Sequence, residues 1–134
     1  MRFASVRIIT NDVDRLVEFY ERVTGLATRR LAPQFAELVT PSCTLAIGAA
    51  ETMALFGDGA AVPESNRTAI LEFLVDDVDA DYERLTNLTV DIEIVQKPTT
   101  MPWGNRSLLF RDPDGNLINY FTPLSDEARA RLAP

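Results

Sequence analysis

The stretch NDVDRLVEFYERV, residues 11–23, has a shortened copy later in the chain, DDVDADYERL at residues 76–85. Each copy places Asp-Val-Asp at the end of an apolar run and continues to Tyr-Glu-Arg. Asp12 and Asp77 are well placed to cap the helices that the following apolar spacing predicts. A strand-to-helix junction that occurs twice in 134 residues predicts that the two halves are structural copies.

Each half is expected to contain one helix and four short strands. The first helix follows Asp12 and should end near Gly25, because glycine readily adopts the conformation that closes a helix. The predicted strands are residues 3–10, about 26–31, about 34–40 and about 43–48, then 68–75, 90–96, 106–110 and 116–121. Between the last two strands, DPDGN at 112–116 predicts a tight hairpin turn.

The order strand–helix–strand–strand–strand therefore occurs twice, which predicts an α+β fold of tandem βαβββ modules. We expect a single domain over residues 1–134, because domains commonly span ~100–200 residues. Its predicted parts are a first module at about 1–48, a linker at about 49–67, a second module at about 68–123 and a C-terminal helix at about 125–132. The linker is weakly periodic, with one helical turn expected around 52–56.

The composition narrows the range of functions. A formal net charge of −7 and a pI near 4.5 argue against nucleic-acid binding, which requires basic surfaces. No segment resembles a membrane span or a signal peptide, so we expect a cytoplasmic protein without membrane contact. The sequence contains no histidine, and it therefore lacks the commonest general base near neutral pH and the commonest transition-metal ligand.

Two segments, NDVDRLVEFYERVTGL at 11–26 and PWGNRSLLFRDPDGN at 102–116, resemble the vicinal-oxygen-chelate superfamily. This superfamily includes glyoxalase I, extradiol dioxygenases and bleomycin-resistance proteins, and the resemblance covers about residues 3–123. It implies two modules whose sheets curl around a cleft, with helices packed outside. It also implies a homodimer, so a second copy of the chain is an expected partner.

The resemblance also indicates where a metal would be held in the enzymes of the superfamily. Their ligands come from the first and last strands of each module, and the matching positions here are Ser5, Ala46, Ile70 and Asn119. Two of these side chains are apolar, and the other two are neutral and bind transition metals poorly without charged partners. We therefore expect no metal and no other cofactor.

Strand alternation indicates which side chains line the expected cleft. It places Arg7 beside Ser5 on one strand, Glu72 beside Ile70 on another, and Asn119 on a third. A few polar groups on an apolar lining are typical of small-molecule pockets. The candidate ligand-binding residues are Arg7, Glu72, Trp103, Asn119, Ser5 and Glu37.

Two structural alternatives compete with these binding roles. Arg7 and Glu72 could simply neutralise each other as an ion pair, because inward-facing charges are commonly paired. Trp103 could pack the strand connection instead of stacking on a ligand.

Three hypotheses for the function follow. The first is a metal-independent protein that sequesters a small cationic or aromatic compound, and this is favoured over catalysis because the metal ligands of the family are absent. The second is a metal-independent lyase or isomerase in which Glu72 or Glu37 acts as a general base. The third is an interaction module whose cleft is filled by its own side chains.

Overall fold

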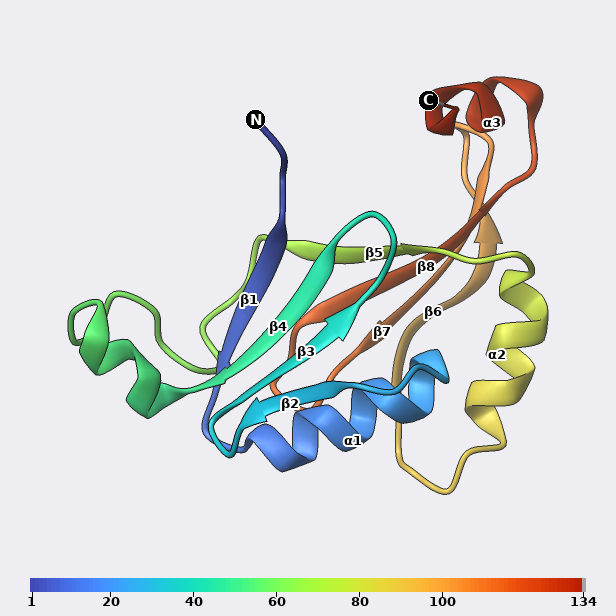
Figure 1. Ribbon diagram of the computed structural model, residues 1–134. Coiled ribbons are helices and arrows are strands. Elements are labelled where there is room, and N and C mark those ends of the chain that lie inside the picture. Colours follow the sequence, from blue (N-terminus) through green and yellow to red (C-terminus); the bar gives the residue numbers. More distant parts are fainter. Residues whose placement is uncertain (134) are drawn as a thin grey trace. The chain divides into compact units, whose positions relative to one another are not determined.

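The structure of the protein, a computed structural model, describes residues 1–133 (Figure 1). The chain divides into two compact units, Met1–Asn66 and a second that begins at Arg67. The elements of the first unit are β1 (Ser5–Thr10), α1 (Val13–Thr24), β2 (Arg29–Ala32), β3 (Phe35–Val39), β4 (Thr44–Ala49) and the 3₁₀ helix η1 (Ala50–Leu55). Those of the second are β5 (Ile70–Leu74), α2 (Val78–Thr86), β6 (Glu93–Thr100), β7 (Asn105–Arg111), β8 (Leu117–Pro123) and α3 (Asp126–Leu132).

The strands of each unit form one sheet, and the two sheets have equivalent topologies. Within residues 1–133 the strand orders are β1-β4-β3-β2 and β5-β8-β7-β6. In each sheet the first strand pairs in parallel with the last strand of its module, and the remaining pairs are antiparallel. The predicted α+β fold of tandem βαβββ modules is confirmed.

Both strand-to-helix junctions have the geometry that their shared sequence predicts. The side chain of Asp12 accepts a hydrogen bond from the N–H of Arg15 at 3.1 Å, and Asp77 accepts one from Ala80 at 3.1 Å. The two aspartates also share an extended backbone, with φ and ψ of −145° and 90° for Asp12 and −148° and 97° for Asp77. The first aspartate of each Asp-Val-Asp therefore caps the helix that follows it, which gives the repeated motif the same structural role in both modules.

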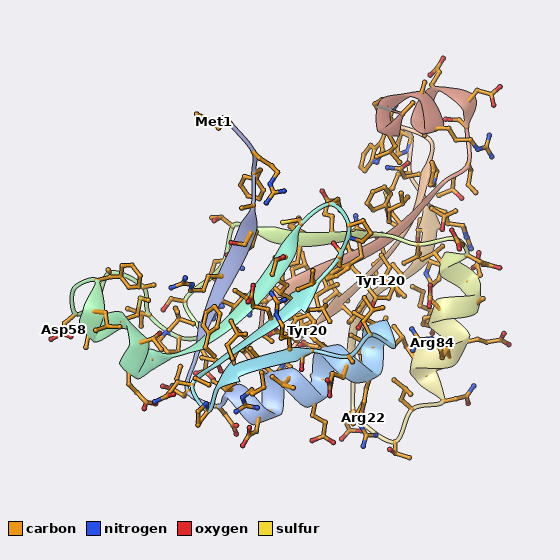
Figure 2. All side chains as sticks on the ribbon, in the orientation of Figure 1. Met1, Tyr20, Arg22, Asp58, Arg84 and Tyr120 are labelled. Carbon is orange, nitrogen blue, oxygen red and sulfur yellow. The ribbon has the colours of Figure 1, made fainter. Side chains whose placement is uncertain are left out.

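In the first unit, α1 packs against one face of the sheet. Leu16, Tyr20 and Val23 are fully buried on this helix, as the predicted apolar stripe requires. They meet the alternate strand residues Ala36, Leu38 and Ile47, which are also fully buried. Tyr20 points from α1 toward the strands of the first sheet (Figure 2). Burying a large apolar side chain contributes about 1.5–3 kcal/mol, so this layer accounts for much of the unit's stability.

The second unit has an equivalent core between α2 and its sheet. Val78 and Leu85 of α2 are each 1% exposed, and Phe110 and Ile118 on the strands are fully buried. Tyr120 packs edge-on against Phe110, with ring centroids 5.0 Å apart and planes at 85°. Burial raises the pKa of the Tyr120 hydroxyl well above its ordinary range, so this tyrosine is a neutral core residue.

The hairpin turn between β7 and β8 is organised by one buried carboxylate. Asp112 Oδ1 accepts from the backbone N–H of Asp114 and of Asn116, each at 2.9 Å, and Asp112 Oδ2 accepts from Asn116 Nδ2 at 2.8 Å. Gly115 closes the turn at φ 84°, a conformation that favours glycine. The turn predicted from DPDGN is confirmed.

The C-terminal helix α3 lies directly against the strand connection at Gly104. Ser125 caps α3 by accepting from Ala128 N at 3.0 Å, at the start of the helix predicted from about 125. Gly104 has φ 92°, and a Cβ on it would overlap Ser125 Oγ and lie 3.2 Å from Ala128 Cβ. Only glycine permits this close approach without a shift of the helix.

Several element boundaries differ from the sequence predictions. The strand predicted at 90–96 begins at Glu93 and continues to Thr100, because β6 follows the full length of β7 and accommodates Pro98 beside register shifts. The helical turn expected at 52–56 is η1, which starts at Ala50. None of the helices within residues 1–133 is long and apolar enough to cross a membrane.

Candidate functional site

The face of the first sheet that is turned away from α1, here called the first distal face, carries several candidate residues. Register places Arg7 beside Ala46 of β4, Ala46 beside Glu37 of β3, and Glu37 beside Arg29 of β2. Residues paired in this way project to the same side of a sheet, so the four form one row across it. Ser5 lies two residues before Arg7 and shares its face. Ser5 and Arg7 therefore share a face of the sheet, as strand alternation predicts, and Glu37 lies on the same face.

Arg7 lies against two aromatic rings. Its guanidinium carbon is 5.2 Å from the centroid of Phe35 and 5.5 Å from that of Phe56. Phe35 pairs with Gly48, next to the row, and Phe56 directly follows η1. Each contact is a cation–π interaction, which contributes about 0.5–1 kcal/mol at an exposed site. The rings hold the flexible arginine side chain in a defined position.

Glu37 is paired within the same row. Its Oε1 lies 3.3 Å from Nη2 of Arg29, and its side chain is only 19% exposed. The carboxylate is therefore oriented toward β2 by Arg29. Both its placement on the distal face and its ion pair depend on how β3 pairs with β4 and β2, which the short strand left uncertain in the sequence.

In the second unit, the face of the sheet away from α2, here called the second distal face, carries Glu72 and Asn119. They are register partners on β5 and β8, and Asn119 Nδ2 donates to Glu72 Oε2 at 2.8 Å. Ile70 and Leu74 flank Glu72 and are 48% and 58% exposed. The side-chain oxygen of Asn119, Oδ1, is buried and accepts no hydrogen bond from the described residues 1–133. This face thus presents an oriented carboxylate on apolar surface.

The structure bears on the two structural alternatives, the packing of Trp103 and the ion pair between Arg7 and Glu72. Trp103 is 57% exposed, so more than half of its surface is open, and its backbone oxygen accepts from Arg131 Nη2 at 2.6 Å. Arg7 and Glu72 belong to different units, and each has the partners described above within its own unit. Their mutual ion pair stays a prediction.

The donor set at the four expected metal positions does not suit a transition metal. Ser5 and Ala46 are the positions in the first unit, and Ile70 and Asn119 those in the second. None of the four is an anion or an imidazole, the ligands that such metals prefer in proteins. No group of three or more His, Cys, Asp or Glu side chains that could hold a metal occurs in residues 1–133.

A hollow near the start of α1 was not anticipated from the sequence. It has a volume of about 370 Å³ and is lined by Asn11, Asp12, Val13, Asp14, Arg30, Pro33, Gln34, Ala49 and Glu51. Arg30 lies across it, donating to Asp14 Oδ1 and to the carbonyl oxygen of Pro33, each at 2.7 Å. The lining comes from three separated segments, so no single motif could have revealed it.

Away from the distal faces, one exposed ion pair connects α2 to β7. Arg106 donates through Nε to Asp79 Oδ2 at 2.8 Å and through Nη2 to Oδ1 at 3.0 Å. These hydrogen bonds lower the pKa of Asp79 and raise that of Arg106. The pair joins a helix to a strand and therefore has a structural role.

Fold and site together define a class of protein: two βαβββ modules whose distal sheet faces carry a few oriented charges among apolar and aromatic groups. The family model for the Glyoxalase/Bleomycin resistance protein/Dioxygenase superfamily matches residues 2–120. The chain belongs to this superfamily, and the resemblance inferred from the sequence is confirmed.

Known relatives agree with this assignment. The uncharacterized protein YraH of Bacillus subtilis (strain 168) is 32% identical, and the match covers 92% of this chain and 100% of that protein. A crystal structure of a glyoxalase/bleomycin resistance protein/dioxygenase from Nocardioides is 27% identical, with a TM-score of 0.77 over 94% of this chain and 85% of that one. A family enzyme from Burkholderia phytofirmans PsJN shares the fold, with a TM-score of 0.80 at 21% identity over 92% of this chain and 100% of its own.

Proposed function

We propose that this chain is a metal-independent binding protein that sequesters a small cationic or aromatic compound on its distal sheet faces. The observation that carries the proposal is the residue set at the four family metal positions. Ser5, Ala46, Ile70 and Asn119 supply no anionic or imidazole donor. A scaffold that has lost the means to activate substrate through a metal keeps surfaces suited to binding.

The chemistry of the distal faces supports a small organic ligand. Binding sites for such ligands combine apolar surface with a small number of oriented polar groups. The first face offers Arg7 beside Phe35 and Phe56, and the second offers Glu72 beside Ile70 and Leu74. Trp103, an exposed indole, adds a surface for stacking on a planar or cationic group.

A thermal-shift screen tests the proposal directly. A compound that binds only the native state raises the melting temperature with increasing concentration, so cationic aromatic compounds should produce such a rise. Glu72→Ala or Trp103→Ala should reduce it, whereas Glu83→Ala, which removes an exposed glutamate on α2, should not. Rises of equal size in all three variants would exclude Glu72 and Trp103 from the binding site.

Elemental analysis tests the metal-independent part separately. Purified protein should contain no stoichiometric zinc, iron, nickel or manganese, and the thermal shift should survive dialysis against a chelator. One transition-metal ion per chain, lost together with ligand binding on chelation, would overturn the proposal.

A catalytic alternative is favoured by one observation at Glu72. Its carboxylate is exposed and held in a defined orientation by the 2.8 Å hydrogen bond from Asn119, so it is accessible to a substrate proton. A metal-independent lyase or isomerase would lose turnover in the isosteric Glu72→Gln variant. Glu37 is less suited to this role, because Arg29 already occupies its carboxylate.

We further propose that the protein is a cytoplasmic homodimer, as its superfamily resemblance implies. Light scattering coupled to size-exclusion chromatography should give twice the 14.9 kDa mass of the chain. A mass of one chain at micromolar concentration would contradict the dimer.

A further inference from the structure

The environment of Arg7 carries an inference about the chemical class of the ligand. Arg7, Phe35 and Phe56 meet on the first distal face, although they come from β1, β3 and the segment after η1. A Cβ on Gly48 would lie 3.4 Å from Thr52 Oγ1 and 3.6 Å from Phe35 Cδ2, so η1 lies over this same part of the sheet. The segment around Asp58, visible at the edge of Figure 2, continues from this position.

The hydrogen-bond donors of Arg7 are not used within its own unit. Among the described residues of the first unit, none gives the guanidinium of Arg7 a hydrogen bond or an ion pair, and the guanidinium lies against the two rings. A guanidinium group meets aromatic rings through its flat face, whereas its N–H donors lie in its plane. Arg7 can therefore keep both ring contacts while its edge binds a planar oxyanion through two hydrogen bonds.

The charge of the first distal face also favours an anion. Its strands contribute Arg7, Arg29 and Glu37, and Glu37 is already paired with Arg29. The carboxylate of Glu37 is therefore directed to Arg29, and no ion pair neutralises Arg7 within its own unit, although the adjoining segment 50–58 also carries Glu51 and Asp58. The net charge of −7 thus does not decide the sign of the charge on a ligand that Arg7 binds.

We propose that Arg7 binds the carboxylate of a small aromatic acid, whose ring lies against the exposed surface of Phe35 and Phe56. Phe56 is 67% exposed and Val39, on the same face, is 49% exposed, so apolar surface is available beside the charge. The rings restrain Arg7 before the ligand arrives, which lowers the entropy cost of forming the two hydrogen bonds. This inference rests on the proposed binding function and narrows its ligand to aromatic carboxylates.

Isothermal titration of the full chain with four matched compounds tests the proposal. Benzoate carries both the ring and the carboxylate, benzamide has no charge, benzylamine carries the opposite charge, and acetate lacks the ring. Benzoate should bind at least tenfold more tightly than each of the other three. Benzamide or benzylamine binding as tightly as benzoate would overturn the proposal.

Variants locate the site. Arg7→Met retains the length of the side chain but removes its charge, and should weaken benzoate binding at least tenfold. Arg7→Lys keeps the charge without the planar fork and should fall between wild type and Arg7→Met. Arg15→Met is the matched control, because Arg15 is an exposed arginine on α1 outside the distal face. Circular dichroism confirms that each variant folds before it is titrated.

The outcomes also separate this inference from the proposed function. Binding of benzylamine alone, lost in Glu72→Ala, would leave the proposed function intact and overturn the assignment to Arg7. If Arg7→Met and Arg15→Met weaken benzoate binding equally, the assignment to Arg7 is likewise overturned and the proposed function is left intact. If none of the four compounds binds, the inference fails together with the aromatic part of the proposed function.

Discussion

Replacement of Asp112 should destabilise the protein more than its position in a turn would suggest. The carboxylate accepts from two backbone N–H groups and from the Asn116 side chain, at 2.8–2.9 Å. Asp112 and Asn116 are each only 5% exposed. In Asp112→Ala these three donors lose their acceptor. A buried donor without a partner costs about 1–3 kcal/mol, and the low end applies where water can enter a hairpin tip, so the expected loss is about 3 kcal/mol.

A second substitution at the same position separates the contributions. Asp112→Asn keeps one oxygen that can accept from both backbone N–H groups, but it turns an amide toward Asn116 Nδ2, which is also a donor. Its free energy of unfolding should fall by about 1–2 kcal/mol, less than in Asp112→Ala. The control is Asp91→Ala, an exposed aspartate before β6, whose change should stay within about 0.5 kcal/mol.

Urea denaturation followed by circular dichroism measures all three variants. Equal slopes with denaturant would show that the variants differ in stability and not in the surface exposed on unfolding. A loss below about 1 kcal/mol for Asp112→Ala, or a larger loss for Asp112→Asn than for Asp112→Ala, would refute the reasoning.

Two further predictions concern the second unit. Because Arg106 holds the pKa of Asp79 below its ordinary value, ionised Asp79 stabilises the folded state at neutral pH, and this contribution is lost as the pH falls through the folded pKa, below about pH 4. The difference in unfolding free energy between wild type and Asp79→Asn should therefore shrink in acid, and a pH-independent difference would contradict the ion pair. Gly104→Ala should destabilise the chain by about 1–3 kcal/mol more than Gly25→Ala, since both have positive φ but only at Gly104 does a Cβ meet Ser125. If thermal unfolding shows equal losses of stability in the two variants, α3 can shift away from the added Cβ at no energetic cost, and the prediction is wrong.

Much of the fold was predictable from local pattern. The helix caps at Asp12 and Asp77, the turn at 112–116 and the alternation in β1 and β5 each depend on residues close together in sequence. Such signals survive folding because tertiary contacts reinforce them. The end of β6 was missed because its partner β7 extends it past Pro98, a residue that interrupts most strands.

The site was predictable only in part, and for a physical reason. Alternation placed Arg7 and Ser5 on one face, but it left the register of Glu37 open, and nothing in the sequence indicated that Phe56 would contact Arg7. Phe56 lies in a weakly periodic segment, and its position depends on where η1 directs the chain. The exposure of Trp103, which lies in a strand connection, is likewise not encoded by any periodicity.

The capping aspartates have a consequence for how the acidity of this chain is understood. Asp12 and Asp77 are held by backbone N–H groups, and Asp79 and Glu37 by arginines. These carboxylates already have hydrogen-bond or ion-pair partners that hold helices and strands in place. Part of the acidity behind the isoelectric point near 4.5 therefore serves to secure the backbone, and the net charge alone does not define the charge of a ligand.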